Sequence, residues 1–225
     1  YYAAGLQPRT AVGNPYGDGY YDDFNTAVGL DSAGRTQLHH KGKLVIGVEN
    51  TPTVIFDLMQ FLVIDLGGVV GQIGMGQHGT AFAHAGMRMG PAICYEGLYG
   101  DFYGDFVRRG AQFMAIISND GWWGDTPGYK HLFTISRLRA IEHRRAIARS
   151  ANTGMSGFIS ARGDIGETLG WEKRGVISAA VPLNSELTFY TRYGDYLGRI
   201  SEYLMLLCVL YYIAYRAKKK NHLVK

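Results

Sequence analysis

Apolar residues recur along this chain in patterns that predict alternating strands and helices. Continuous apolar runs cover residues 89–95 and 113–118, as expected for strands that are buried on both faces. Between them, residues 98–109 place Phe102 and Phe106 four positions apart and end before a glycine, which predicts a helix. This region is therefore predicted to be a strand, a helix and a second strand.

A longer amphipathic helix is predicted over residues 129–150. Its apolar stripe consists of Leu132, Ile135, Leu138 and Ile141. Five arginines of the same segment fall outside this stripe. Two further strands are predicted at residues 156–161 and 175–181, with a turn at residues 162–164. Strands that alternate with helices are typical of the α/β class, which we expect here.

The amino-terminal part is predicted to hold a strand hairpin and long loops. Residues 24–30 and 44–48 have strand character, and Asp31-Ser32-Ala33-Gly34 after the first is a turn sequence. Residues 1–20 are rich in glycine, proline, tyrosine and asparagine. Residues 66–90 carry eight glycines with little periodicity, so a long functional or mobile loop is expected there.

The carboxy-terminal part changes character. Residues 203–215 carry no charge, and Arg216 and three lysines at 218–220 follow at once. Thirteen residues are fewer than the roughly 20 that cross a bilayer, so length alone favours a core or interfacial helix. Tyrosines near both ends of the run and the cationic cluster after it favour a membrane span. Upstream, Leu197 and Ile200 extend the apolar face.

Composition and charge narrow the class of protein. The chain is 47% apolar and 19% charged, which indicates a folded protein and excludes a disordered one. Five of its 23 cations lie in residues 216–225, which hold no acids, so 18 cations face 19 acids elsewhere. No basic face for nucleic acid is evident. The chain starts at Tyr1 rather than Met, so we expect it to begin inside a longer protein.

Cys94 is the first candidate for chemistry. It lies between a predicted buried strand and a predicted helix, in a turn that would direct its thiol out of the sheet. A thiolate there could attack a carbonyl, with the backbone N–H of Tyr95 available to a developing oxyanion. The other interpretation is a small buried apolar residue, as expected for Cys208. Two cysteines do not make a disulfide framework.

A thiolate needs a nearby cation or base. Among the seven histidines, His39 and His40 are the most suggestive, although a solvated turn is the favoured interpretation. Lys41 stands just ahead of the strand predicted at 44–48, and Glu49 ends it. A desolvated lysine held by a carboxylate can stabilise a thiolate or an oxyanion, but this segment taken alone favours surface positions for the lysine and the glutamate. No metal-ligand spacing occurs, so we expect no metal.

Four segments in order resemble signatures of the nitrilase, or carbon–nitrogen hydrolase, superfamily. They are residues 26–49, Cys94-Tyr95-Glu96, residues 118–124 and residues 151–154. Within the superfamily, Ala92-Ile93-Cys94-Tyr95-Glu96, the Asn-Asp-Gly-Trp-Trp-Gly-Asp run and the helix at 137–142 resemble the apolipoprotein N-acyltransferase branch. The resemblance covers nearly the whole chain.

The resemblance implies an α-β-β-α sandwich of the nitrilase type, followed by one C-terminal transmembrane helix. Residues 1–195 would form the catalytic domain, residues 196–217 the transmembrane helix and residues 218–225 a basic cytoplasmic tail. The protein would be a multi-pass protein of the bacterial inner membrane with a periplasmic catalytic domain. No cofactor is expected.

The resemblance also assigns roles to residues. Cys94 would be the nucleophile and Lys41 the catalytic lysine. The supporting residues would be Glu49, Tyr95, Glu96, Asn119 and Trp122. The family's general-base glutamate would precede Tyr1, so Glu49 is not expected to serve as the base. Two departures from the family are Ile46, where proline is usual, and the glycine-rich stretch at residues 61–90.

The implied reaction moves an acyl chain from a phospholipid, through a thioester on Cys94, to the amine of an N-terminal diacylglyceryl-cysteine of an apolipoprotein. The apolar segment at residues 55–64 would either dip into lipid or lie in the core. Two other functions stay open. One is a soluble amidase or nitrilase of the same superfamily, and the other is a catalytically incomplete module tethered to the membrane.

Overall fold

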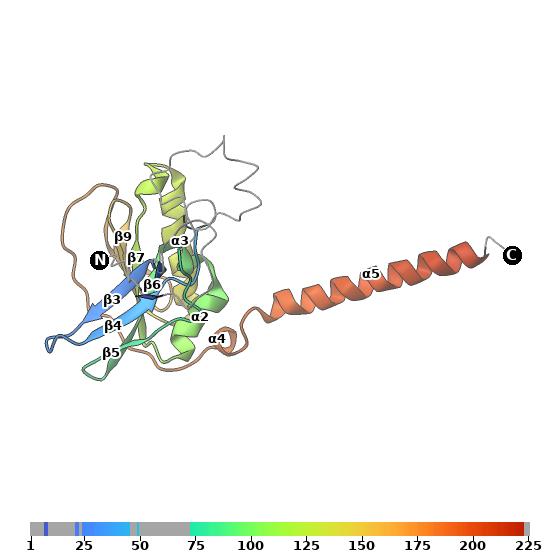
Figure 1. Cartoon of the computed structure of the whole chain (residues 1–225). Coiled ribbons are helices and arrows are strands. Elements are labelled where there is room, and N and C mark those ends of the chain that lie inside the picture. The colour runs from blue at the N-terminus through green and yellow to red at the C-terminus, as the bar shows by residue number, and fades with distance from the viewer. Residues whose placement is uncertain (1–6, 9–20, 23, 46–48, 50–72, 223–225) are drawn as a thin grey trace.

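The structure is a computed structural model and describes residues 7–8, 21–22, 24–45, 49 and 73–222 (Figure 1). Short strands β1 (Gln7–Pro8) and β2 (Tyr21–Asp22) pair with each other. The other strands are β3 (Thr26–Leu30), β4 (Thr36–His40), β5 (Phe82–His84), β6 (Met87–Ile93), β7 (Phe113–Ser118), β8 (Ile147–Ala151), β9 (Ser156–Ile159) and β10 (Ile165–Leu169). The helices are η1 (Cys94–Leu98), α2 (Gly100–Arg108), η2 (Gly121–Trp123), α3 (Pro127–His143), α4 (Phe189–Tyr193) and α5 (Tyr196–His222).

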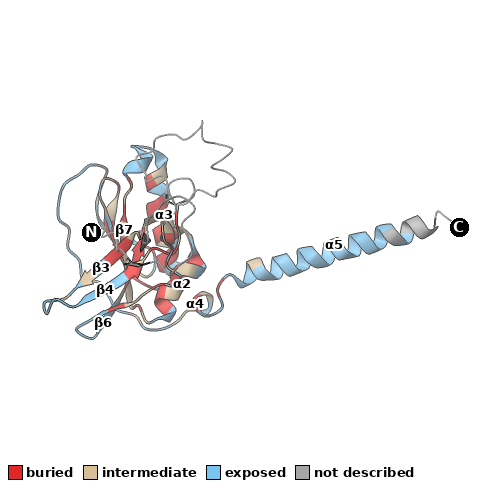
Figure 2. Cartoon of the chain, viewed as in Figure 1, coloured by how far each residue is buried: buried red, intermediate tan, exposed pale blue. Residues whose placement is uncertain are grey.

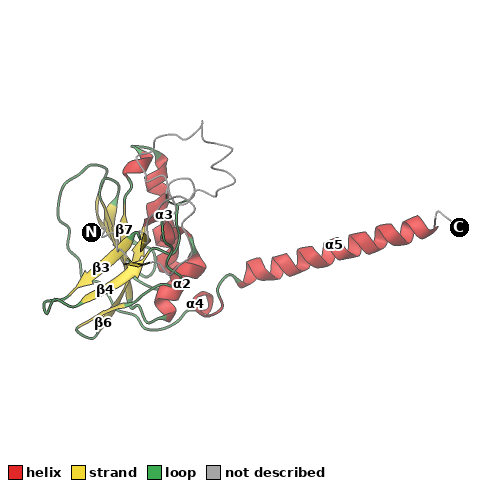
Figure 3. Cartoon of the chain, in the orientation of Figure 1, coloured by secondary structure: helices red, strands yellow, loops and turns green. Residues whose placement is uncertain are grey.

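A six-stranded mixed sheet forms the centre of the molecule, in the order β10-β9-β8-β7-β6-β5 (Figure 3). The three central strands, β6, β7 and β8, are parallel, and the outer strands are antiparallel. Parallel neighbours need long crossovers, which α2 and α3 supply. The carboxyl ends of β6, β7 and β8 therefore meet at one edge of the sheet. The predicted α/β class and strand β7 are confirmed.

Helices α2 and α3 pack on one face of this sheet (Figure 2). Tyr103 and Phe106 of α2 and Phe133 of α3 lie in one apolar cluster with Met114 and Ile116 of β7. All five are nearly inaccessible to solvent, and each fully buried side chain of this size stabilises the fold by about 1.5–3 kcal/mol. This core fixes the strand edge on which the site is built.

Strands β3 and β4 form a separate antiparallel hairpin. The turn predicted at residues 31–34 is confirmed, because Asp31 Oδ1 accepts bonds from the backbone N–H groups of Ala33 and Arg35. The predicted hairpin partner at 44–48 is wrong, because β3 pairs with β4. Leu44 and Val45 are irregular, and the rest of that predicted strand, residues 46–48, lies outside the described part. The apolar run at residues 44–48 indicated the wrong partner, because most residues of β4 are polar.

The long loop predicted at residues 66–90 is confirmed at residues 73–81, which form no helix or paired strand, and is wrong at residues 82–90. Residues 50–72 are not described, but β5 and β6 form a hairpin within residues 82–93. Its two-residue turn is Ala85-Gly86, and both residues have positive φ, of 47° and 79°. This geometry matches the twist of paired strands, but Ala-Gly is a weak sequence signal for it.

The helix predicted at 129–150 is seven residues too long at its end. Helix α3 ends at His143, Arg144 adopts φ 49° as its left-handed cap, and β8 follows. The predicted stripe is also partly wrong, because Leu138 and Ile141 are exposed. The buried face of α3 instead comprises Tyr129, Leu132, Phe133, Ser136, Arg139, Ala140 and His143. The polar residues on this face have partners: Ser136 donates to the carbonyl of Leu132, Arg139 donates to Glu142, and His143 Nδ1 lies 2.9 Å from Thr191 Oγ1.

The end of the sheet also differs from the prediction. The strand at 156–161 is confirmed as β9, and the turn at 162–164 leads into β10. Residues 175–181, predicted as a strand, are described and form none. β10 takes the edge instead, because the tight turn with Gly163 at φ 86° returns the chain directly alongside β9.

Helix α5 extends away from the rest of the molecule (Figures 1 and 2). Its segment from Tyr196 to Arg216 spans 21 residues, and an 18-residue window of it has a mean hydropathy of 1.4 with no buried residue. Length and composition thus suffice for one membrane crossing, and the segment is longer than the 13 uncharged residues alone indicate.

Candidate active site

Cys94 occupies a sharp turn between β6 and η1. Its φ of 45° lies in the left-handed region, which costs a residue other than glycine about 1–3 kcal/mol. A strained strand-to-helix turn of this kind directs a nucleophile away from the sheet. The thiol is free and half-buried. The predicted strand–turn–helix setting of Cys94 is confirmed.

A cavity of about 380 Å³ opens at the carboxyl edge of the parallel strands. Cys94 follows β6, and Asn119 follows β7, so both project from the edge where α/β proteins bind ligands. The lining residues are Asn25, Lys41, Val45, Glu49, Cys94, Tyr95, Asn119, Trp122, Trp123 and Leu132. Of the seven residues expected in the site, the structure brings six into this wall, and Glu96 is buried beneath it.

Lys41 reaches the cavity from the hairpin. It directly follows β4, rather than preceding a strand as predicted, and its side chain is 2% exposed. Its Nζ donates to both carboxylate oxygens of Glu49, at 2.8 and 2.7 Å. Glu49 also accepts from Asn25 Nδ2 at 2.9 Å and from the N–H of Val45 at 2.8 Å. Glu49 is thus fully engaged in orienting Lys41.

Glu96 connects the two halves of the site from below. Its side chain is completely buried, and its oxygens accept from the backbone N–H groups of Gly42 and Ile93, both at 2.6 Å. Gly42 follows Lys41, and Ile93 precedes Cys94. His39 Nε2 also lies 3.1 Å from Glu96 Oε2. The solvated turn favoured for His39 and His40 is therefore wrong: His39 is a buried residue of β4.

His40 points to the other side of β4. Its Nδ1 lies 2.8 Å from Thr26 Oγ1, and its ring packs on Phe24. Burial, followed by the neighbouring His39, lowers the pKa of His40. His40 does not line the cavity, and Lys41 is the only cation among the described residues that do.

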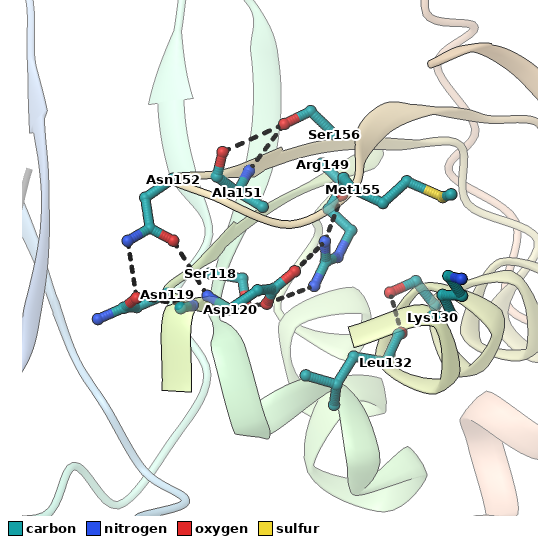
Figure 4. Close-up of polar contacts among 12 residues, drawn as sticks. Ser118, Asn119, Asp120, Lys130, Leu132, Arg149, Ala151, Asn152, Met155 and Ser156 are labelled. Atoms are coloured by element: carbon teal, nitrogen blue, oxygen red, sulfur yellow. Dashed lines mark hydrogen bonds and ion pairs between the residues drawn. The ribbon is translucent and has the colours of Figure 1, made fainter. Parts of the chain in front are cut away.

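The loop that carries Asn119 is held by amide contacts. Asn119 Oδ1 accepts from Asn152 Nδ2 at 2.7 Å, and Asn152 Oδ1 accepts from the N–H of Asp120 at 3.1 Å (Figure 4). Asn119 follows β7 and Asn152 follows β8, so the two sequence signatures at 118–124 and 151–154 meet in space. Their side chains fix the wall of the cavity.

A buried ion pair supports this loop from inside. Arg149 donates to both oxygens of Asp120, at 3.0 and 3.1 Å, and Ser118 donates to Asp120 Oδ1 at 2.5 Å (Figure 4). Arg149 also donates to the carbonyl of Met155. Position 154 next to this ion pair requires glycine, because the Cβ of any other residue would lie 2.1 Å from Asp120 Oδ2.

Two tryptophans form the outer wall of the cavity. Trp122 and Trp123 are each 45% exposed and follow one another in η2. Trp123 packs on the first turn of α3, where a Cβ on Gly128 would lie 2.4 Å from its ring. With Val45 and Leu132, the tryptophans give the cavity an extensive apolar surface next to Cys94.

Several residues of the site were not identified from the sequence. They are Asn25, Val45, Trp123, Leu132 and Arg149, while His39 was noted but assigned to a solvated turn. The sequence did contain an indication of the position of His39. Residues two apart in an extended segment point to the same side, and His39 in β4 lies two residues before Lys41. The apolar segment at 55–64 and Ile46 lie outside the described residues.

Comparisons with known proteins show the family of this chain. Residues 2–187 match the family model of the carbon–nitrogen hydrolases, so the chain belongs to the carbon–nitrogen hydrolase family. It is 36% identical over 181 residues to an apolipoprotein N-acyltransferase of Chlorobaculum tepidum. This aligned region covers 78% of this chain and 34% of the relative. An apolipoprotein N-acyltransferase of Verminephrobacter eiseniae is 34% identical and covers 80% of this chain and 34% of the relative. The resemblance inferred from the motifs is confirmed.

The chain spans about a third of the length of these curated relatives. Among solved structures, a mutant of an amidase of the nitrilase superfamily from Nesterenkonia AN1 is similar, with a TM-score of 0.53 at 16% identity. That match covers 80% of this chain and 61% of the amidase. Nit3 of Saccharomyces cerevisiae, a member of the nitrilase superfamily, has a TM-score of 0.50 at 18% identity over 68% of this chain and 51% of Nit3. The nitrilase-type α/β fold is confirmed.

Proposed function

We propose that this chain carries the catalytic centre of an N-acyltransferase that takes an acyl chain from a phospholipid. The acceptor in this proposal is the amine of an N-terminal diacylglyceryl-cysteine on an apolipoprotein. The proposal depends mainly on one observation: Cys94, Lys41 and an apolar wall share a single cavity. The naming of the relatives as apolipoprotein N-acyltransferases supports it.

In the first half-reaction, Cys94 Sγ attacks the ester carbonyl of the phospholipid. A C–S bond forms, and the carbonyl oxygen becomes an oxyanion that the Lys41 ammonium and the N–H of Tyr95 stabilise. The ester C–O bond then breaks. The lysophospholipid leaves carrying on its alkoxide oxygen the proton that the Cys94 thiol has lost, and an acyl thioester remains on Cys94.

In the second half-reaction, the acceptor amine attacks the thioester carbonyl. A C–N bond forms, the C–S bond breaks, the amine loses one proton and the thiol is restored. Thioester to amide is downhill. Glu49 is not the base in this scheme, because both of its oxygens hold Lys41, Asn25 and Val45.

The roles of the other residues follow from their contacts. Glu49 keeps Lys41 oriented and charged, and Asn119 and Trp122 form the wall along which an acyl chain lies. A wall of Trp122, Trp123, Val45 and Leu132 suits a chain of methylene groups, because each buried methylene contributes about 0.8 kcal/mol. A small amide substrate would leave much of this surface unused.

The test compares the two cysteines of the chain in a transfer assay. Purified protein in phospholipid micelles is given a diacylglyceryl-cysteine peptide, and acylation of the peptide amine is followed. We expect Cys94→Ala to abolish transfer, while Cys208→Ala, on the exposed surface of α5, keeps it. Full transfer by Cys94→Ala would overturn the proposal.

The same assay separates the other two candidate functions. A soluble amidase would release ammonia from small amides and transfer no acyl chain to the peptide. A non-catalytic tethered module would bind micelles and do neither. Either pattern in the protein with both cysteines intact would contradict the transferase.

A further inference from the structure

A buried histidine–glutamate pair lies beneath the cavity, between the two sheets that form it. His39 belongs to the β3–β4 hairpin, and Glu96 belongs to η1 at the edge of the six-stranded sheet. Both side chains are 0% exposed. His39 Nε2 lies 3.2 and 3.1 Å from the two oxygens of Glu96.

The remaining contacts of Glu96 are the ones that relate Lys41 to Cys94. Glu96 Oε1 accepts from the N–H of Gly42, and Oε2 accepts from the N–H of Ile93. One carboxylate therefore joins the residue after the lysine to the residue before the nucleophile. The separation of Lys41 and Cys94 depends on the orientation of this carboxylate, because the two residues come from different sheets.

His39 is the side chain that orients the carboxylate. Its Nε2 faces both oxygens, while its Nδ1 lies 3.4 Å from Thr80 Oγ1 and its ring meets Phe106 edge-on at 4.8 Å. These contacts fix the ring, so Nε2–H is aimed at Glu96. His39 lies in β4, two residues before Lys41, and both residues are buried.

We propose that His39 is a positioning residue that acts through Glu96 to hold Lys41 at its working distance from Cys94. The expected change in the rate of acyl transfer rests on the proposed function. The role of His39 in positioning Lys41 relative to Cys94 does not. A displacement of about 1 Å in a catalytic group can cost about 10²-fold in rate. Loss of the His39 contact lets Glu96 rotate and is expected to displace Lys41 on that scale.

The first test compares two substitutions at position 39. His39→Phe keeps the ring that packs on Phe106 and removes the donor, whereas His39→Gln keeps one N–H near the position of Nε2. We expect His39→Phe to lower kcat of acyl transfer 10- to 100-fold with KM for the phospholipid nearly unchanged. His39→Gln should restore most of the loss. His40→Gln, on the opposite side of the same strand, is the control and should change kcat less than twofold.

The second test asks whether His39 acts through Glu96. In a Glu96→Ala background, where the carboxylate is already absent, adding His39→Phe should lower kcat by less than twofold further, as coupled residues do. Additive losses of His39→Phe and Glu96→Ala would overturn the inference. So would equal kcat values for His39→Phe and His39→Gln.

A readout that needs no acyl donor keeps this inference separate from the proposed function. The rate of Cys94 alkylation by iodoacetamide at pH 7 reports the setting of the thiol directly. It should fall in His39→Phe and recover in His39→Gln, with Cys208→Ala as the background and thermal unfolding as the check on folding. If alkylation changes in this way while no transfer occurs, the positioning role stands and the proposed function fails. If the folded His39→Phe protein is alkylated at the unaltered rate, the positioning role is wrong.

Discussion

Asp120 and Arg149 illustrate how single residues hold the walls of the cavity. Their side chains are 0% and 1% exposed and meet through two hydrogen bonds. A buried ion pair adds little net free energy of stabilisation, because removing both charges from water is costly. Burying either charge without its partner is strongly destabilising. The pair thus fixes the Asn119 loop without adding much to overall stability.

Removing only one member of the pair should therefore be costly. We expect Asp120→Ala to lower the free energy of unfolding by about 3–5 kcal/mol, because Arg149 is left buried and unpaired. The double variant Asp120→Ala with Arg149→Met should regain much of this loss. Chemical denaturation measures both. Arg109→Ala, which breaks the exposed pair with Asp105, is the control and should cost less than about 1 kcal/mol.

Lys41 supports a kinetic prediction at the same scale. It is the only cation that the described residues place in the cavity wall, and it is held by Glu49. We expect Lys41→Ala to lower kcat of acyl transfer by about 10²–10³-fold, as the loss of one oxyanion donor does. Lys43→Ala is a nearby control, since Lys43 packs over the Tyr99 and Phe102 rings rather than in the wall. Equal losses in the two variants would contradict the role of Lys41.

The sequence allowed the reacting residues to be predicted better than their supports. Cys94, Lys41 and Glu49 were identified through motifs, and the structure brings them together. Arg149 was not identified and His39 was assigned to a solvated turn, because burial of a charged or polar side chain depends on a partner that is distant in sequence, such as Asp120 or Glu96. A surface position is the usual expectation for such residues.

At the scale of elements, α2, α3 and α4 meet around His143. Its side chain is buried, its Nδ1 lies 2.9 Å from Thr191 Oγ1, and its ring packs against Tyr103 and Tyr190. Burial, assisted by the charge of Arg139, lowers the pKa of His143 to about 3. The native protein therefore keeps this histidine neutral at pH values where an unfolded chain would protonate it.

This difference predicts acid sensitivity of a definite sign. Below about pH 6.5 the unfolded state takes up a proton at His143 and the native state does not, so stability falls as pH decreases toward 3. The slope from this residue is about 1.4 kcal/mol per pH unit. His143→Phe should remove that slope between pH 6 and pH 5 when unfolding is measured by denaturant. An unchanged slope would show that His143 is protonated in the native state.

Element boundaries could be predicted only where local signals agreed with tertiary pairing. Strand β7 has such agreement. The end of α3 does not, because residues 144–150 continue a helical pattern while Ile147–Ala151 pairs with β7 and β9. Likewise, β4 forms from Thr-Gln-Leu-His-His because β3 is beside it, although the sequence itself has little strand character.

At the scale of the whole molecule, the proposed membrane topology divides the chain into residues 1–195, 196–217 and 218–225. The exposed apolar surface of α5 and the lysines at 218–220 support a span with its basic end in the cytoplasm. The catalytic centre would then lie on the periplasmic side of the inner membrane. No described residue of the span from Tyr196 to Arg216 is buried against the domain.

The orientation predicts where a C-terminal tag is found. In intact spheroplasts a tag after Lys225 should be protected from an added protease and become cleavable after the membrane is permeabilised. A tag that is cleaved before permeabilisation would contradict this topology. Fusion of the same tag to a known periplasmic protein provides the positive control for access.

The most direct measurement is the mass of the protein after incubation with phospholipid and no acceptor. We predict that it increases by one acyl chain, that the increase maps to the peptide containing Cys94, and that hydroxylamine removes it, as expected for a thioester. Addition of the diacylglyceryl-cysteine peptide should discharge the chain onto its amine. An acyl chain found on Cys208 instead, or transfer to the peptide by a protein that never carries one on Cys94, would contradict the mechanism.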